Sequence, residues 1–231
     1  MAFYGWPLDL RVHASIILGV IRVSEVSNPL NKSLWGGGGS PYRIGSKKFG
    51  MWLFIVSDSI TFVTMLIAYS YLRVSTETWP TPFHLWPSLV NATLMTIVLL
   101  GSSLTMVFAV NSSKKGNRSH VVWWIVCTML GGIIFDILHI KEWLDLIHEG
   151  VTLVQNPWGT PLFGASFFSL TGLHMTHVTA GVVYLGIIAI GTARGKFTHE
   201  DVESSGLYWH FVDLVWMFIF PLVYLMSTNL N

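Results

Sequence analysis

The chain has 231 residues, of which 52% are hydrophobic and only 11% are charged. A soluble domain carries about 25% charged residues, so this composition excludes an ordinary soluble protein and indicates a membrane protein. The formal net charge of +1 gives no reason to expect a nucleic-acid partner. The single cysteine, Cys127, excludes an internal disulfide framework and a copper site built from two cysteines.

Five runs of mostly apolar residues reach the roughly 20 residues that a membrane-spanning helix needs. We therefore expect an all-α fold, a polytopic bundle of five transmembrane helices. Residues 1–48 are expected to form a cytoplasmic or interfacial leader with a glycine-rich linker, because the apolar stretch SIILGVI is too short to span. Residues 49–231 are expected to form the transmembrane domain. The expected spans are 49–72, 86–110, 120–147, 163–192 and 207–227.

The distribution of Lys and Arg predicts the orientation of the spans. Eleven of the 13 basic residues lie in the leader and in the second and fourth connections, all on one side of the membrane. The other side carries only Arg73 and Lys141. By the positive-inside rule, the N-terminus is cytoplasmic and the C-terminus lies outside. Tryptophans near the span ends, including Trp209 at the cytoplasmic side, fit an aromatic belt at each interface.

Small residues within the spans predict where helices approach closely. They are Gly101, Ser102, Ser103, Gly131, Gly132, Gly172, Gly181 and Gly186.

Ionisable side chains lie inside three spans, where hydrocarbon should surround the helix. A charge at the bilayer centre costs at least about 2.5–3.5 kcal/mol, so such a residue usually faces a bundle interior, a partner or a proton path. The residues are Asp58, His174, His177, His210 and Asp213.

Asp58 lies nine residues inside the first span, roughly 13 Å deep and near the midplane. His174 and His177 are three positions apart and share one helix face. If the first and fourth spans adjoin, Asp58 pairs with one of these histidines and the pair can relay protons. Two other interpretations stay open: the histidines only tie helices together, or they bind a metal with His210 completing the ligand set.

Other charged residues lie nearer the expected span borders. His210 and Asp213 are three apart, within the first turns of the fifth span counted from the cytoplasmic side. Glu142, Asp145 and Glu149 are expected to form a solvated face at the outer end of the third span. The basic residues at the cytoplasmic borders suit lipid phosphates, at about 1 kcal/mol each, without defining a specific site.

Three blocks of sequence, in this order, resemble subunit III of the haem–copper oxidases, such as cytochrome c oxidase. They are GMWLFIVSDSITFVTMLIAYSYLR (50–73), FFSLTGLHMTHVTAG (167–181) and YWHFVDLVWMFIF (208–220). HIKEWLDLIHEG (139–150) is a weaker fourth match. Five spans resemble the bacterial members that lack the first two helices. The family usually has glutamate where Asp58 stands and commonly glutamine where His139 stands.

The resemblance implies a non-redox accessory subunit of a proton-pumping terminal oxidase in the bacterial inner membrane. Subunits I and II are the expected partners, with haems and copper held by the partner subunits and none by this chain. The resemblance implies no catalytic residue and no metal ligand here, but a phospholipid bound between helices. Asp58 matches the family's buried carboxylate, and Glu142 matches its outer glutamate. The remaining matches are the paired histidines His174 and His177 and the terminal His210 and Asp213. Arg194 lies near, but not in strict register with, a lipid-contacting arginine of the family. The candidates for lipid binding are Arg194, Lys196, His210 and Trp209.

Alternatives remain at this point. Within the same family, the chain could serve a quinol oxidase or be the accessory protein of a nitric oxide reductase. Outside it, a membrane metalloenzyme would use His174, His177 and His210, and a proton or ion transporter would use the intramembrane carboxylates.

Overall fold

The structure, a computed structural model, describes residues 46–229. The expected leader at residues 1–48 therefore lies almost entirely outside the described residues, and positions 46–48 belong to the first turn of a helix. Within the described part, five helices are long and apolar enough to cross a membrane. The prediction of an all-α, five-span fold is confirmed. The helices are α2 (Ser46–Ser75), α3 (Val90–Lys114), α4 (Arg118–His148), α5 (Pro161–Ala193) and α6 (His199–Ile219).

Short elements extend the ends of α3 and α6. A π-helical turn, η2 (Leu85–Leu89), leads into α3. After α6 the chain continues through η3 (Phe220–Tyr224) and η4 (Leu225–Ser227). Two residues of the connection between α2 and α3, β1 (Phe83–His84), then pair in parallel with β2 (Thr228–Asn229). This pairing brings the α2–α3 connection onto the end of the bundle that lies away from Lys47.

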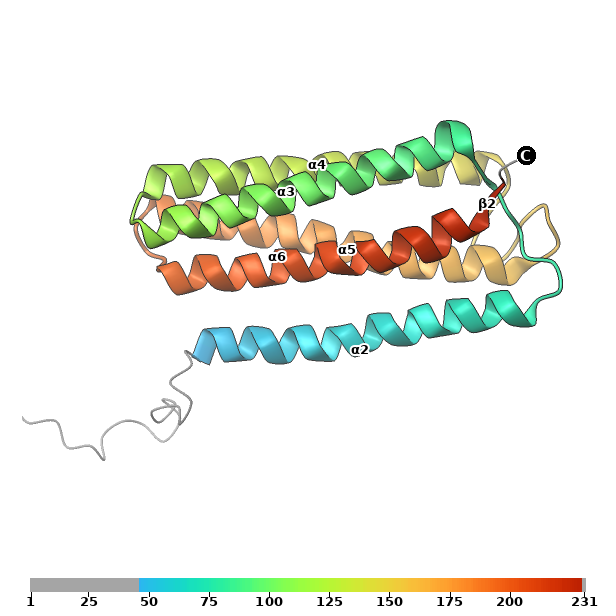
Figure 1. Cartoon of the computed structure of the whole chain (residues 1–231), viewed down its shortest axis with the longest axis horizontal. Helices are drawn as coiled ribbons and strands as arrows, with labels where there is room; N and C mark the ends of the chain where they lie inside the picture. Colours follow the sequence, from blue (N-terminus) through green and yellow to red (C-terminus); the bar gives the residue numbers. More distant parts are fainter. Residues whose placement is uncertain (1–45, 230–231) are drawn as a thin grey trace, which may run out of the picture. The chain divides into compact units, whose positions relative to one another are not determined.

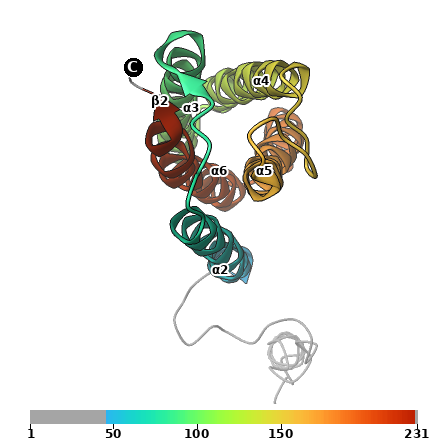
Figure 2. The ribbon, with the colours of Figure 1, turned by 90° about the vertical axis from the view of Figure 1, so that its right-hand side faces the viewer.

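Helices α3 to α6 form a four-helix group in which each helix packs against two neighbours (Figure 2). Successive helices run in opposite directions (Figure 1). Helix α2 lies outside this group, next to α5 and α6, and runs in the same direction as α6 (Figures 1 and 2).

Glycines allow the closest approaches inside the four-helix group, as the small-residue pattern predicts. A Cβ atom on Gly131 of α4 would lie 2.6 Å from the Cβ of Ser102 of α3. A Cβ on the adjacent Gly132 would lie 2.5 Å from the indole of Trp209 on α6, and Gly181 of α5 faces the same indole. Trp209 therefore fills a space that these glycines open. Gly101, by contrast, has open space where its Cβ would be.

Helix α6 begins eight residues before the expected start of the fifth span. Its first two turns, HEDVESSG, are polar, so the expected membrane span from residue 207 covers only the apolar part of a longer helix. A capping box explains the earlier start: Thr198 caps the backbone at Asp201, and the Thr198 N–H donates to the Asp201 carboxylate at 2.8 Å. The helix thus projects a charged turn beyond its apolar part.

Helix α2 contacts the rest of the protein through a narrow stripe. Ile55, Phe62 and Tyr69, spaced seven residues apart, are buried. Between them lie apolar side chains that face away, such as Ile60 and Ile67, each 64% exposed. A contiguous apolar surface of this kind is stable only against lipid or another apolar protein surface.

We expect that Gly132→Ala destabilises the bundle by about 1–3 kcal/mol, because the new methyl group meets Trp209 and Val182. Gly101→Ala is the matched control, since its methyl group meets nothing within 4 Å. Unfolding of both variants in detergent micelles, followed by circular dichroism against denaturant, measures the difference. Equal stability of the two variants would contradict the packing described for Trp209.

Candidate functional site

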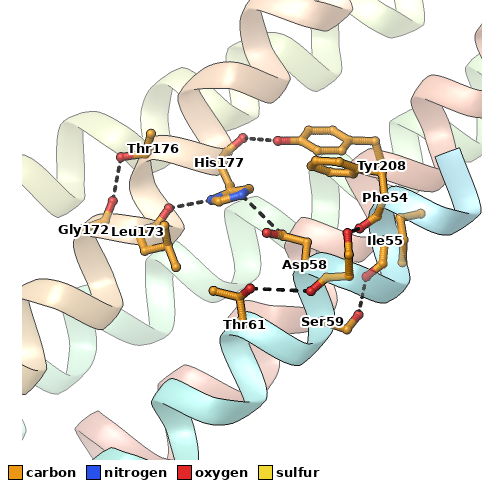
Figure 3. Close-up of polar contacts among 11 residues, drawn as sticks. Phe54, Ile55, Asp58, Ser59, Thr61, Gly172, Leu173, Thr176, His177 and Tyr208 are labelled. Atoms are coloured by element: carbon orange, nitrogen blue, oxygen red, sulfur yellow. Dashed lines mark hydrogen bonds and ion pairs between the residues drawn. The ribbon is translucent and has the colours of Figure 1, made fainter. Parts of the chain in front are cut away.

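The candidate site is a carboxylate–imidazole contact between α2 and α5. His177 Nε2 lies 3.2 Å from Asp58 Oδ2, and the two side chains are 16% and 14% exposed (Figure 3). Asp58 lies twelve residues after Ser46, roughly 18 Å along α2. Of the two histidines considered from the sequence, the structure therefore places His177, and not His174, against Asp58.

The second ring nitrogen of His177, Nδ1, determines how the ring can interact with Asp58. His177 Nδ1 lies 2.8 Å from the carbonyl oxygen of Leu173 (Figure 3). A carbonyl oxygen only accepts hydrogen bonds, so Nδ1 carries a hydrogen and Nε2 of the neutral ring is an acceptor. An unprotonated Nε2 and an ionised Asp58 would then present lone pairs to each other. One proton, on either Asp58 or Nε2, turns this repulsion into a hydrogen bond.

Apolar rings surround the pair. The Phe62 ring packs edge-on against the His177 ring, with centroids 5.2 Å apart. The hydroxyl of Tyr208 on α6 donates to the backbone carbonyl of His177 at 3.0 Å, and Phe54 of α2 packs against the Tyr208 ring (Figure 3). This arrangement joins three helices around one protonatable contact and limits its exposure to water.

Polar contacts also connect the first turn of α2 with α6, and its last turns with η4, which follows α6. At its first turn, Lys47 pairs with Asp201 at 2.6 Å, and Lys48 pairs with Glu203 at 2.8 Å. At its last turns, the Tyr69 hydroxyl lies 3.2 Å from the Ser227 hydroxyl. Further contacts there run from Arg73 to Ser227 Oγ at 2.8 Å and to the Met226 carbonyl. From the sequence, these basic residues indicated only which side of the membrane is cytoplasmic. The acidic first turn of α6 was the one signal that could have revealed the ion pairs.

His174 lies in a different environment from His177. It is fully buried inside the four-helix group, and its ring stacks on Trp216 at 5.2 Å and 26°. His139 of α4 is fully buried on the other side of Trp216, at 5.5 Å. Neither ring has a hydrogen-bond partner among residues 46–229. The spacing predicted that His174 and His177 share one helix face. In the structure His174 lies in the core of the four-helix group, whereas His177 lies against α2.

His210 and Asp213 lie in the middle of α6. Because α6 begins at His199, they stand roughly 17 and 21 Å along the helix, within the first turns of its apolar part. His210 Nδ1 contacts the Ser103 hydroxyl of α3 at 3.0 Å. Asp213 is buried, and its Oδ1 has no partner within the described residues. The structure does not bring either residue to Asp58.

Glu142 is not part of a solvated face, so that expectation was wrong. It is 5% exposed, and the Tyr224 hydroxyl donates to its Oε2 at 3.2 Å. Asp145 and Glu149, on the same helix, are exposed as expected. Tyr224 arrives from the turn after α6, a long-range contact that no local pattern in the sequence signals.

The residues considered for lipid binding divide by exposure, and His210 is half-buried. Arg194 and Lys196, in the connection between α5 and α6, are exposed. Trp209 is 1% exposed, and its indole N–H donates to the Ser102 hydroxyl at 3.0 Å. Its expected place in an interfacial aromatic belt was therefore wrong. Because the indole is enclosed, Arg194, Lys196 and His210 remain the candidates for lipid binding.

The alternative of a histidine metal centre finds no support in the geometry. Across the described range, no three or more His, Cys, Asp or Glu side chains form a group that could hold a metal ion. His174, His177 and His210 have separate partners and surroundings.

The fold and site define a multi-pass membrane protein in which an outlying helix contacts the other helices through a half-buried carboxylate–imidazole pair. The sequence matches the model of the family described as cytochrome c oxidase subunit III over residues 34–228. The chain therefore belongs to the cytochrome c oxidase subunit III family, as its sequence blocks indicated.

Its relatives include proteins named for two kinds of oxidase. Quinol oxidase subunit 3 of Bacillus spizizenii is 38% identical over 77% of this chain and 86% of the relative. Cytochrome c oxidase subunit 3 of Alkalihalophilus pseudofirmus is 36% identical over 80% and 89%. Cytochrome bo(3) ubiquinol oxidase subunit 3 of Pseudomonas aeruginosa is 32% identical over 79% and 86%. These are subunits of respiratory oxidases, so the chain is a multi-pass bacterial membrane protein of a hetero-oligomeric oxidoreductase complex.

A double-mutant cycle tests whether Asp58 and His177 interact energetically. We expect a coupling free energy of about 0.6–2 kcal/mol between Asp58→Ala and His177→Ala, because each single change leaves a polar partner in apolar surroundings. Denaturant unfolding of the wild type, both single variants and the double variant measures it. Additive losses would show that the 3.2 Å contact contributes nothing.

Proposed function

We propose that the chain is the non-redox accessory subunit of a proton-pumping terminal oxidase that reduces O2 to water. Family membership supports this assignment. The proposed mechanism rests on the contact between Asp58 and His177, which lies among apolar side chains between α2 and α5. Haems and copper belong to the partner subunits. The single cysteine of this chain is insufficient for a two-cysteine copper site, and no catalytic residue is assigned to the chain.

Orientation and partners follow from charge and exposed apolar surface. The end of the bundle with Lys47, Arg118 and Arg194 faces the cytoplasm under the positive-inside rule, and the C-terminus lies outside. Subunit I, which holds the haem–copper centre, covers part of the apolar surface of the bundle, and subunit II completes the assembly. Phospholipid covers the rest, with Arg194 and Lys196 placed to meet its phosphates.

The role of Asp58 and His177 is to hold a proton at the seam between α2 and the four-helix group. Because His177 Nδ1 is engaged by Leu173, the pair is stable with one shared proton and is weakened when that proton leaves. The pair thereby supports proton uptake by the complex and keeps α2 docked during turnover. In this proposal Glu142, His210 and Asp213 have structural roles, as polar side chains that hold neighbouring helices together.

The electron donor is either cytochrome c or a quinol, and relatives with both names stand at similar identity. The donor site lies on other subunits. A two-cysteine copper motif in the neighbouring subunit II favours cytochrome c, and its absence favours quinol.

Purification of the complex tests the assignment itself. We expect the chain, isolated in mild detergent from its native membrane, to copurify with a haem-bearing subunit. A reduced-minus-oxidised optical spectrum should then show a-, b- or o-type haem, and mass spectrometry should identify subunits I and II. A stable, haem-free homo-oligomer of this chain alone would overturn the proposal.

Replacement of Asp58 tests the mechanistic part. We expect Asp58→Ala to slow proton uptake or shorten the active lifetime of the complex, because His177 Nε2 loses its partner. Asp58→Glu, which restores a carboxylate, should retain most of both properties, and Ser57→Ala is an exposed neighbouring control. Proton release and O2 consumption by reconstituted complexes provide the readouts. Unchanged uptake, pumping and lifetime in Asp58→Ala would remove the pair from the mechanism.

A further inference from the structure

A pocket opens at the end of the bundle opposite Lys47. It lies between the α2–α3 connection, the start of α3 and the last turns of α4, and it offers about 80 Å³ to water molecules. Polar side chains form much of its wall, including Ser88, Asn91, Asp145 and Glu149. A space of this size with several polar partners meets the requirements for ordered water.

Glu142 connects this pocket with the interior. The residue lines the pocket, yet its side chain is almost completely buried. Its Oε2 accepts a hydrogen bond from Tyr224, whereas its Oε1 has no partner in the described part of the chain. The carboxyl group therefore has a free acceptor or donor position at the inner wall of the pocket.

Two fully buried imidazoles lie beyond Glu142. His139 is one helical turn from Glu142 on α4, and His174 faces the same core from α5. All four of their ring nitrogens are buried and without partners among residues 46–229. Buried polar atoms in proteins are almost always hydrogen-bonded, either to protein or to ordered water. These two rings are therefore the largest unmet hydrogen-bonding demand in the described core.

The aromatic neighbours of the two rings offer them no free polar group. The Phe135 ring lies 5.5 Å from His139 and 5.7 Å from His174 and has no polar atom to offer. The indole N–H of Trp216 already donates to Thr96, and that of Trp143 donates to Thr171. A metal ion would need a third ligand, and the described residues provide no such group. Water is the ligand class that fits.

We propose that the pocket is the mouth of an internal water site, in which water passes Glu142 and hydrogen-bonds to His139 and His174. His174 is one turn from His177 on α5, so this water comes within one helical turn of the Asp58–His177 pair. The contact between α2 and α5 then has water close to it on the side of the four-helix group. This inference concerns only the chain's own interior and does not depend on the proposed oxidase role.

Histidine C2 hydrogen–deuterium exchange, read by mass spectrometry on the intact purified complex, tests the proposal. We expect the C2 positions of His139 and His174 to take up deuterium, more slowly than that of the exposed His148 at the same end. Absence of uptake at both buried positions while His148 exchanges fully would show a dry core and overturn the proposal.

A plugging variant tests the route. We expect Asn91→Phe, which fills the pocket, to slow exchange at His139 and His174 roughly tenfold by restricting access. Thr93→Phe is the matched control, because Thr93 lies on the same helix but is exposed outside the pocket. Equal exchange in both variants would overturn the pocket as the entrance. If Asn91→Phe does not assemble, Ser88→Leu narrows the same pocket, and the wild-type measurement still decides whether the core is wet.

Discussion

The lipid bilayer around α2 limits which interactions can hold this helix against the others. Between helices in a bilayer there is no hydrophobic driving force, because lipid tails are as apolar as leucine side chains. Helix α2 buries only a stripe of one residue in seven, at Ile55, Phe62 and Tyr69. Its attachment therefore rests on packing along this stripe and on polar contacts at three levels. The ion pairs of Lys47 and Lys48 at the first turn of α2 are partly exposed, whereas Asp58 and His177 meet among apolar rings.

This location gives the central contact a property that the end contacts lack. Lys47 and Lys48 form ion pairs with Asp201 and Glu203 that water and salt screen. Under the proposed function, the Asp58–His177 contact, whose ring Nδ1 is engaged by Leu173, holds one shared proton. Helix docking and proton occupancy are then linked at a single position. The adjacent His174 faces the aromatic core instead, so two histidines three residues apart belong to different sites.

Sequence reasoning predicted the five spans and most of their close glycine contacts, because length, hydropathy and small-residue patterns are local properties. It did not predict that α6 begins at His199, since the polar capped turn at Thr198 carries no membrane signal. Spacing placed His174 and His177 on one face but could not say which neighbour each would meet. Glu142 and Trp209 were misjudged for a related reason. Their burial depends on Tyr224 and on Gly132, residues far away in the chain that only the fold brings near.

The central claim is that Asp58 and His177 share an exchangeable proton. Infrared difference spectroscopy of the intact complex, with Asp58→Asn used to assign the Asp58 carboxyl band, measures this most directly. The account predicts a band that changes with the pH of the medium and shifts in frequency when His177 is replaced by glutamine. A band that is independent of pH and indifferent to His177 would contradict it.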